Sequence, residues 1–486
     1  MNKEKVMKKL ISIAFASLIM MSCRKEFIDL VPISSVSVDI LYKTDKDFSD
    51  ALTATYNSFQ TVYIDRYIIG DVRADDSWQE ISKSNSQSYS DLFTTSSSDG
   101  LLSSQWQYFY MAIFRINTIL TKIEPLTETT VPNKARYIAE AKFLRALAYF
   151  DLVRIFGDVP MVTLPLSISE SYKTPREPVA KIYSTIIIPD LLAVEGVLPS
   201  KYTGNDVGRP TSGAAKSLLG KVYLTTGDFQ KAEAKLLEVT TLGYSLLPKY
   251  TDLFDYTKNE HHSEYIYDIE YEEGMGEGSP WNRRFAPNNI TFTTFYGIGG
   301  NGDEQNGPTQ TLIDLFAAND LRKDVTVGVR GGFIGANGVF VKLTSNTNQT
   351  YTKKYIVASA AADDSKANWK VIRYGDVILM LAEAMNENGK TAQAIPYLNQ
   401  IRTRAGLTGY ATTMTQAATR DAIVLERRLE LSFEGHRWFD LVRTGKAYDV
   451  MKSTGMQPYM TVWPLPLSQV QIVNNASIFP QNPGYE

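Results

Sequence analysis

The sequence predicts a mainly α-helical protein: a scaffold of paired helices with irregular loops and short strands inserted on one side. Three observations favour this fold class. Long stretches repeat apolar residues at helical spacing, a helix–turn–helix unit occurs twice, and Gly- and Asn-rich stretches separate the units. With 486 residues the chain is long enough for an extended scaffold, and its net charge of −3 gives no basic field. We therefore do not expect nucleic acid as a partner.

The N-terminus has the pattern of a lipoprotein signal peptide. Four lysines in "MNKEKVMKKL" precede the apolar run "ISIAFASLIMM", which is too short to span a bilayer as a lasting helix. Cys23 follows a small residue and is the only cysteine, so we expect residues 1–22 to be removed and Cys23 to be lipidated. An ordinary signal peptide with an incidental cysteine is the alternative. Residues 23–40 then form a lipid-anchored tether before a folded domain over residues 41–486.

The first strong helical pattern is "ARYIAEAKFLRALAYFDLVRIFGDVP", which begins at Ala135. Its large apolar residues fall on one helical stripe: Ile138, Phe143, Leu147, Phe150 and Val153. Gly157 follows this stripe and Pro160 lies just beyond it, a combination that ends helices. We expect one long helix that ends near Phe156.

A repeated unit identifies the scaffold. "AAKSLLGKVYLTTGDFQKAEAKLLEVT", from Ala214, aligns with "GDVILMLAEAMNENGKTAQAIPYLNQIR", from Gly375. Each unit is a helix, a glycine-bearing turn and a second helix, with small residues where the two helices approach. This is the pattern of tetratricopeptide repeats, and it defines clear repeats near residues 211–242 and 369–404.

Such a unit cannot bury its apolar face alone, so further copies are expected. Two degenerate pairs bring the expected number to about four. The first joins the stretches near residues 45–63 and 106–123, and the second joins those near residues 135–156 and 179–192.

Between the clear repeats the composition changes. "EYIYDIEY" reads as a strand, and it leads into a Gly-, Asn- and Pro-rich insertion near residues 272–308. A second irregular region, residues 328–367, mixes short β-like runs with turns. Loops of this length in a compact body are usually functional or disordered, so the insertion near 272–308 is the candidate ligand loop.

Motifs for metal, nucleotide or catalytic chemistry are weak. "GIGGNG", from Gly297, fits a nucleotide-binding pattern, but no strand–helix–strand unit surrounds it. His261 and His262 are adjacent on a strand-like stretch and point to opposite faces, which makes them poor partners for one metal. No G-x-S-x-G or H-E-x-x-H motif occurs. We therefore expect no cofactor, no metal and no catalytic residue.

The most catalytic-looking stretch, "ERRLELSFEGHRWFDLVRTGK", runs from Glu426 to Lys446. Its glutamates recur every four residues and share one face of a helix that should end at Gly435. Arg427 and Arg437 each stand three residues from a glutamate, which allows ion pairs along the helix. Carboxylates ringed by arginines stay ionised, whereas a general acid needs a raised pKa. This stretch, with its His436, is therefore interpreted as a structural network whose loss should lower stability and not ligand affinity.

These residues carry a resemblance to a known family. The stretch from Glu426 closely resembles the C-terminal signature of the SusD/RagB family of outer-membrane nutrient-binding lipoproteins. "VIRYGDVILMLAEAMNENG" with "AIPYLNQIRTRAGL" is similar to the family's preceding segment, and "AEAKFLRALAYFDLVRIFGDVP" is similar to its N-terminal half. The order of the segments, the lone cysteine and the length agree, so the resemblance covers essentially the whole mature chain.

The resemblance implies a function. Family members are non-catalytic proteins that capture a glycan, or in some members a peptide, and present it to a TonB-dependent, SusC-like transporter in the outer membrane. A lipid anchor at Cys23 would hold this chain there, and we expect it to face the extracellular surface. Arg24 and Lys25 stand where the family's surface-export signal is typically acidic. A helical-repeat scaffold for protein assembly and a surface enzyme are the other two hypotheses.

The ligand is expected at the inserted loops, where exposed aromatic rings flanked by polar side chains suit sugars. Three stretches fit this description, and in the family the binding residues tend to come from the first stretch and the central insertion. The candidate ligand-binding residues are Arg73, Asp75, Asp76 and Trp78; Trp281, Asn282 and Arg283; and Tyr296. Trp78 and Trp281 are expected to be dispensable for folding. The remaining tryptophans, at positions 106, 369, 438 and 463, are expected in the core.

Overall fold

The computed structural model describes residues 41–79, 85–286, 302–329, 332–334, 340–342 and 350–485. The predicted signal peptide, Cys23, the tether and Tyr296 lie outside these residues. So does the motif 297–302 apart from Gly302.

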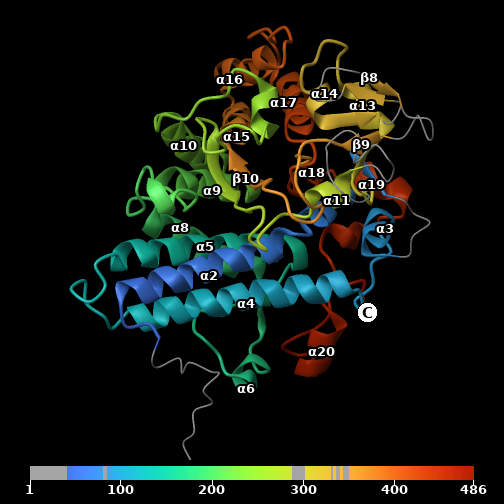
Figure 1. Cartoon of the computed structure of the whole chain (residues 1–486). Helices are drawn as coiled ribbons and strands as arrows, with labels where there is room; N and C mark the ends of the chain where they lie inside the picture. The colour runs from blue at the N-terminus through green and yellow to red at the C-terminus, as the bar shows by residue number, and fades with distance from the viewer. Residues whose placement is uncertain are drawn as a thin grey trace, which may run out of the picture.

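Four helix pairs follow one another within the described part of the chain and confirm the predicted scaffold (Figure 1). The members of each pair pack against each other, and each pair packs on the next. The pairs are α2 (Asp45–Tyr63) with α4 (Gly100–Ile123), α5 (Lys134–Phe156) with the continuous run α7 (Val179–Ile182), η3 (Tyr183–Ile187) and α8 (Ile188–Val194), α9 (Ser212–Thr225) with α10 (Phe229–Thr240), and α15 (Tyr374–Glu387) with α16 (Thr391–Arg404). A further helix, α17 (Gln416–Glu430), packs on α15 and α16.

The glycines at the turns of the two clear repeats adopt the left-handed conformation that was predicted for them. Gly227 and Gly389 adopt φ values of 78° and 76°, the left-handed conformation that ends the first helix of each pair. Gly220 lies where α9 meets α10, and a Cβ atom there would stand 2.5 Å from the Leu236 side chain. A larger residue at this position would force the Leu236 side chain to shift, so a small residue favours the close approach of the two helices.

Two-stranded ribbons connect distant parts of the chain. β4 (Tyr265–Ile269) pairs antiparallel with β10 (Trp369–Arg373), so the second clear repeat begins with a strand and its first helix starts only at Tyr374. The other ribbons are β1 (Ser77–Trp78) with β5 (Gly307–Pro308), β2 (Val159–Pro160) with β3 (Arg176–Glu177), β6 (Val327–Val329) with β9 (Thr350–Thr352), and β7 (Gly332–Ile334) with β8 (Phe340–Lys342).

Short helices fill the insertions and the C-terminal region. They are η2 (Ile68–Val72), α3 (Ser86–Asp91), α6 (Ile168–Ser171), η4 (Gly204–Asp206), η5 (Tyr250–Phe254), α11 (Trp281–Phe285), α13 (Gln310–Leu315), α14 (Lys323–Thr326), α18 (Arg437–Arg443), α19 (Ala447–Met451), η6 (Lys452–Thr454), η7 (Pro458–Thr461) and α20 (Leu467–Val473). Figure 1 shows β8, β9, α11, α13 and α14 gathered at one side of the helix pairs, as predicted, whereas β10 lies among the helix pairs beside α9.

The helix of the signature stretch ends earlier than predicted. α17 stops at Glu430, and α18 starts at Arg437. Between them Phe433 and Gly435 adopt φ values of 62° and 75°, so the chain turns sharply before Glu434 can extend the helix. Gly70 of η2 packs against this turn, where its Cβ would stand 2.5 Å from the Gly435 carbonyl oxygen.

The C-terminal segment returns to the first half of the chain. The backbone N–H of Trp463 donates to the Ile155 carbonyl at 2.8 Å. The side-chain amide of Asn482 donates to the Phe156 carbonyl at 2.9 Å and to the Trp463 carbonyl at 2.7 Å. The last turn of α5 is therefore completed by residues from the other end of the protein.

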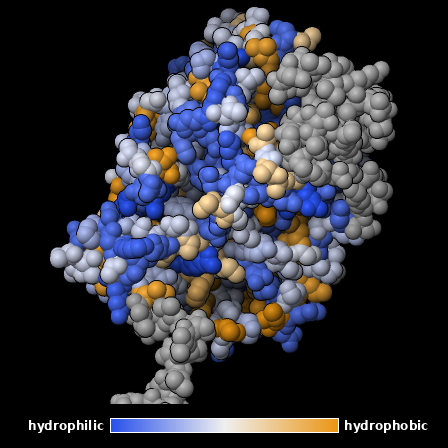
Figure 2. Space-filling model, viewed as in Figure 1, coloured by the Kyte–Doolittle hydropathy of each residue, from blue (hydrophilic) through white to orange (hydrophobic). Residues whose placement is uncertain are grey.

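The predicted core tryptophans at positions 106, 369, 438 and 463 are all buried. Large apolar side chains reach the surface on α6 and α20, at the lower edge of the molecule in Figure 1, and Figure 2 shows hydrophobic atoms at the same edge. None of the helices that the structure describes has the length and apolar character needed to cross a membrane.

Candidate functional site

The glutamates of the signature stretch lie in a buried ion network. Glu430 accepts from Arg373 at 2.6 Å and also contacts Arg404. Glu434 accepts from Arg373 at 2.8 Å and from Lys354 at 2.8 Å. All of these side chains are almost completely buried, so each charge depends on its partners for stabilisation.

The arginines of the stretch pair with aspartates that are distant in sequence, which corrects the expectation of ion pairs along one helix. Arg427 contacts Asp376 at 2.9 Å and Asp440 at 3.1 Å. Arg437 contacts Asp75 at 2.8 Å. The network therefore joins the end of α17 to the second clear repeat, to α18 and to the residues before β1.

These contacts keep the two glutamates ionised, in agreement with the structural interpretation. Burial alone would raise the pKa of Glu430, but the guanidinium groups of Arg404 and Arg373 outweigh it and lower the pKa to about 2. Arg373 and Lys354 likewise outweigh burial and lower the pKa of Glu434 to about 2. Neither carboxyl group has the raised pKa that a general acid needs.

Acid should therefore weaken the fold. Because the pKa values of Glu430 and Glu434 lie below the ordinary value of 4.5, their stabilising effect is complete above that pH and is lost as the pH falls from about 4.5 towards 2. We expect the urea midpoint of unfolding to fall steeply across this range. A midpoint that stays constant from neutral pH to about pH 2 would contradict the assignment.

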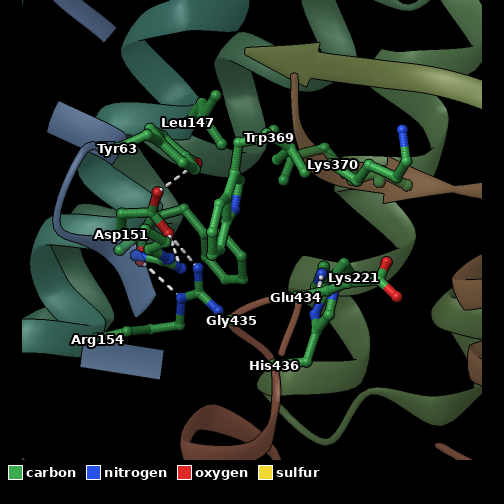
Figure 3. Close-up of a pocket in the computed structure, with 15 residues that line it drawn as sticks. Tyr63, Leu147, Asp151, Arg154, Lys221, Trp369, Lys370, Glu434, Gly435 and His436 are labelled. Atoms are coloured by element: carbon green, nitrogen blue, oxygen red, sulfur yellow. Dashed lines mark hydrogen bonds and ion pairs between the residues drawn. The ribbon is translucent and has the colours of Figure 1, made fainter. Parts of the chain in front are cut away.

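His436 lies beside the same network (Figure 3). Its Nδ1 is 3.1 Å from Nζ of Lys221, which contacts Asp376 at 3.0 Å. Burial and the Lys221 charge lower the pKa of His436 to about 3, so the ring is neutral. The cavity that these residues line holds only about 20 Å³, the size of a water molecule and far too small for a sugar.

His436→Ala should lower stability and leave ligand affinity unchanged. The His436 ring is buried, and its removal leaves the partly buried ammonium group of Lys221 without one of the two partners it has among the described residues, at a cost of about 1–3 kcal/mol. Chemical unfolding measures the first effect, and glycan titration measures the second. A change in affinity at unchanged stability would instead place His436 in a binding site.

Most residues of the first candidate stretch, from Arg73 to Trp78, make contacts within the folded protein. The Arg73 guanidinium is buried against the rings of Phe93 and Trp463, each 4.4 Å away, and donates to the Met460 carbonyl at 2.9 Å. Burial lowers its pKa to about 10. This location contradicts the expectation that Arg73 meets a ligand.

The two aspartates of this group are bound to the signature stretch. Asp76 is buried and accepts from Arg428 at 2.5 Å, while the half-buried Asp75 contacts Arg428 and Arg437, both at 2.8 Å. Both Asp75 oxygens and Oδ1 of Asp76 contact arginines, and Oδ2 of Asp76 is buried, which weakens the prediction of these residues as ligand contacts.

Trp281 and Asn282 are completely buried, and the expectation that they lie on an exposed loop is wrong. Trp281 opens α11, and its ring stacks on Phe285 at 5.7 Å and packs on Trp369 at 5.1 Å. The Asn282 amide donates to the Val357 carbonyl at 2.8 Å. α11 is therefore held as part of the core.

Trp78 and Arg283 retain exposed surface, and the structure brings them to one segment of the chain. Trp78 lies opposite Gly307 in the β1–β5 ribbon, and a Cβ on Gly307 would collide with its indole. Arg283 is exposed and contacts Asp363 at 2.8 Å, and its carbonyl accepts from the Asp303 N–H at 2.6 Å. The chain from Asp303 to Gly307 spans at most roughly 14 Å. The two side chains thus flank residues 303–307.

The sequence reasoning missed the basic partners of the network, which lie in buried segments: Arg322, Lys354, Arg373 and Arg404. A charged residue inside an apolar run, such as Arg373 at the end of "WKVIR", was the available signal. Among the described residues no group of three metal-ligating side chains is present. His261 instead pairs with Glu270 at 3.1 Å.

The helix pairs and their one-sided insertions define a helical-repeat protein of the tetratricopeptide type. The chain belongs to the SusD family: residues 253–485 match the pattern described as the SusD family. Residues 26–224 match a second pattern, described as starch-binding and associating with the outer membrane.

Known proteins resemble the chain over most of its length. SusD-like protein P2 of Formosa agariphila is 27% identical over 93% of this chain and 95% of that protein. A SusD-like protein of Bacteroides ovatus is 28% identical over 89% of this chain and 82% of that protein. Among solved structures, a laminarin binding SusD-like protein is 30% identical, with a TM-score of 0.76 and coverage of 91% of this chain and 100% of that chain. A SusD homologue from Bacteroides thetaiotaomicron, at 23% identity and a TM-score of 0.79 over 93% and 98% of the two chains, shares the fold.

Proposed function

We propose that this chain is a non-catalytic lipoprotein that captures an oligo- or polysaccharide at the outer membrane and delivers it to a TonB-dependent, SusC-like transporter. The observation that carries the proposal is the 30% identity to a laminarin binding SusD-like protein across the whole of that chain. The predicted lipidation of Cys23 and the match to a pattern described as associating with the outer membrane support the location.

The glycan-binding surface is proposed around residues 303–307. Trp78 offers a partly exposed aromatic face at one end of this segment, and Arg283 offers exposed N–H donors at the other end. A sugar needs an apolar platform for its ring face and donors or acceptors for its hydroxyl groups. Tyr296 remains a candidate by sequence alone. Arg73, Trp281 and Asn282 act in the core and are not part of this surface.

Trp78→Ala should weaken binding of a laminarin-derived oligosaccharide by roughly thirtyfold, or about 2 kcal/mol. The expected cause is loss of the aromatic platform. Isothermal titration calorimetry measures the change, and Trp78→Phe, which keeps a ring face, should retain most of the affinity. Equal affinities for the wild type and Trp78→Ala would remove Trp78 from the site.

A wider screen tests the ligand class. The wild-type protein should bind at least one neutral glycan on an array and no member of a matched peptide library. Binding of peptides only would favour the peptide-presenting alternative, and binding of neither would favour a scaffold for protein assembly. New reducing ends after incubation with a bound polysaccharide would show an enzyme and overturn the proposal.

The transporter partner needs its own experiment. The lipidated protein should co-purify from detergent-solubilised membranes of its native cells with a SusC-like transporter. The matched control is Cys23→Ala, which cannot be acylated and should leave the membrane fraction. If no transporter of this class co-purifies with the protein, the proposed delivery step is contradicted, while the proposed glycan capture is unaffected.

A further inference from the structure

A second cleft lies away from the surface proposed above. It has a volume of about 830 Å³, within the range of small-molecule binding sites. Its walls come from residues 200–211 between α8 and α9, residues 242–244 after α10, and residues 259–266 around the start of β4. Neither Trp78 nor Arg283 lines it.

Aromatic side chains in the cleft are partly exposed and firmly held. The Tyr244 ring stacks on Tyr374, with ring centroids 6.3 Å apart at 27°. A Cβ on Gly213 would collide with the Tyr244 hydroxyl, so glycine there makes room for this ring. The Tyr265 hydroxyl donates to Glu270 at 3.1 Å, and its ring packs edge-on against His261 at 4.7 Å. Fixed aromatic faces of this kind suit the apolar face of a sugar ring.

The charges around the cleft favour an anion. The described residues that line the cleft include two cations, Lys201 and Arg209, and no carboxylate. Glu270 contacts the lining residues Tyr265 and His261 but does not itself line the cleft. Arg209 is neutralised by Glu140 at 2.7 Å and Asp206 at 2.8 Å. Lys201 is exposed and forms no ion pair within the described part of the chain, so its ammonium group is available to a ligand.

His262 also lines the cleft and carries a buried donor without an acceptor among the described residues. Its Nδ1 accepts from the backbone N–H of Glu264 at 3.2 Å, so the neutral ring carries its proton on Nε2. That Nε2 is buried and has no partner among the described residues. Burial lowers the pKa of His262 to about 4, which keeps the ring in this neutral form. A buried N–H without an acceptor is unfavourable, and an anionic or hydroxyl oxygen would satisfy it.

We propose that this cleft binds an acidic saccharide, a sugar unit that carries a carboxylate or a sulfate ester. The rings of Tyr244 and Tyr265 take its apolar face, and the exposed ammonium group of Lys201 takes its anionic group. The site shares with the proposed function only the ligand class, a saccharide, and does not depend on Trp78.

The test uses the full mature protein and three acidic tetrasaccharides: a galacturonate, a mannuronate and a sulfated galactan oligomer. Calorimetry should detect binding of at least one of them, and its methyl-esterified or desulfated counterpart should bind at least roughly tenfold more weakly. Lys201→Met should weaken the acidic ligand by roughly tenfold and leave the neutral counterpart unchanged. Tyr244→Ala should weaken binding of both the acidic ligand and its neutral counterpart. Tyr244→Phe keeps the ring, so it should bind both like the wild type and serves as the folding control.

The outcomes separate this inference from the proposed function. Trp78→Ala should leave the acidic ligand's affinity unchanged while it weakens the laminarin-derived ligand. No binding of any of the three acidic oligomers would overturn the cleft assignment, as would acidic binding that is insensitive to both Lys201→Met and Tyr244→Ala. Loss of acidic binding in Trp78→Ala would place both ligands at the first surface.

Discussion

Arg373→Met should lower the free energy of unfolding by about 3–5 kcal/mol. Its guanidinium donates to Glu264 at 2.9 Å, to Glu430 at 2.6 Å and to Glu434 at 2.8 Å. Methionine fills much of the same volume but leaves these buried carboxylates with too little compensating charge. The cost of an uncompensated buried charge exceeds the modest net value of an intact pair, so the effect should be large.

Urea unfolding followed by circular dichroism measures this loss. The matched control is Arg420→Met, because Arg420 pairs with Glu387 at 2.6 Å but stays largely exposed, and exposed pairs contribute about 0–1 kcal/mol. The destabilisation by Arg373→Met should also shrink in acid, where its carboxylate partners become protonated. Similar small effects for both variants would show that the buried network adds nothing to stability.

Trp281→Ala should also destabilise the protein by about 3–5 kcal/mol. Besides Phe285 and Trp369, the indole touches Tyr67 at 6.4 Å, Tyr271 at 5.9 Å and Tyr355 at 6.2 Å between ring centroids. Truncation would leave a cavity among rigid rings that cannot collapse to fill it.

Thermal unfolding checks this result, with Trp78→Ala as the comparison because Trp78 is only half-buried at the edge of a two-residue ribbon. The melting temperature should fall much further for Trp281→Ala than for Trp78→Ala. A Trp281→Ala variant that melts like the wild type would restore the original expectation that this residue is dispensable for folding.

The scaffold could be predicted because its causes are local. Helical spacing, the glycines at positions 227 and 389 and the small residue at position 220 each act within one helix pair. The end of α17 could not be predicted in this way. Phe433 adopts a positive φ that a bulky residue rarely takes, and its side chain packs with Leu312 and Phe316, which are distant in sequence.

The candidate site was less predictable because its residues are placed by distant partners. Glycine and proline around Trp281 suggested an exposed loop, but Trp369 and Tyr355, far along the chain, cover its ring. The sequence predicts Asp76 as a sugar contact, but its carboxylate pairs with Arg428, which lies 352 positions away in the chain. Trp78 and Arg283 remain candidates, because part of each side chain is exposed.

The return of the C-terminal segment to α5 has a consequence for the order in which the protein folds. The carbonyl of Phe156 accepts its hydrogen bond from the side chain of Asn482, which lies 326 positions later in the chain. Closing so long a loop is entropically costly and slow, so the first half of the chain cannot reach its final state while the last residues are still being made. The native contacts at the end of α5 can therefore form only after the C-terminal segment around Asn482 has been synthesised.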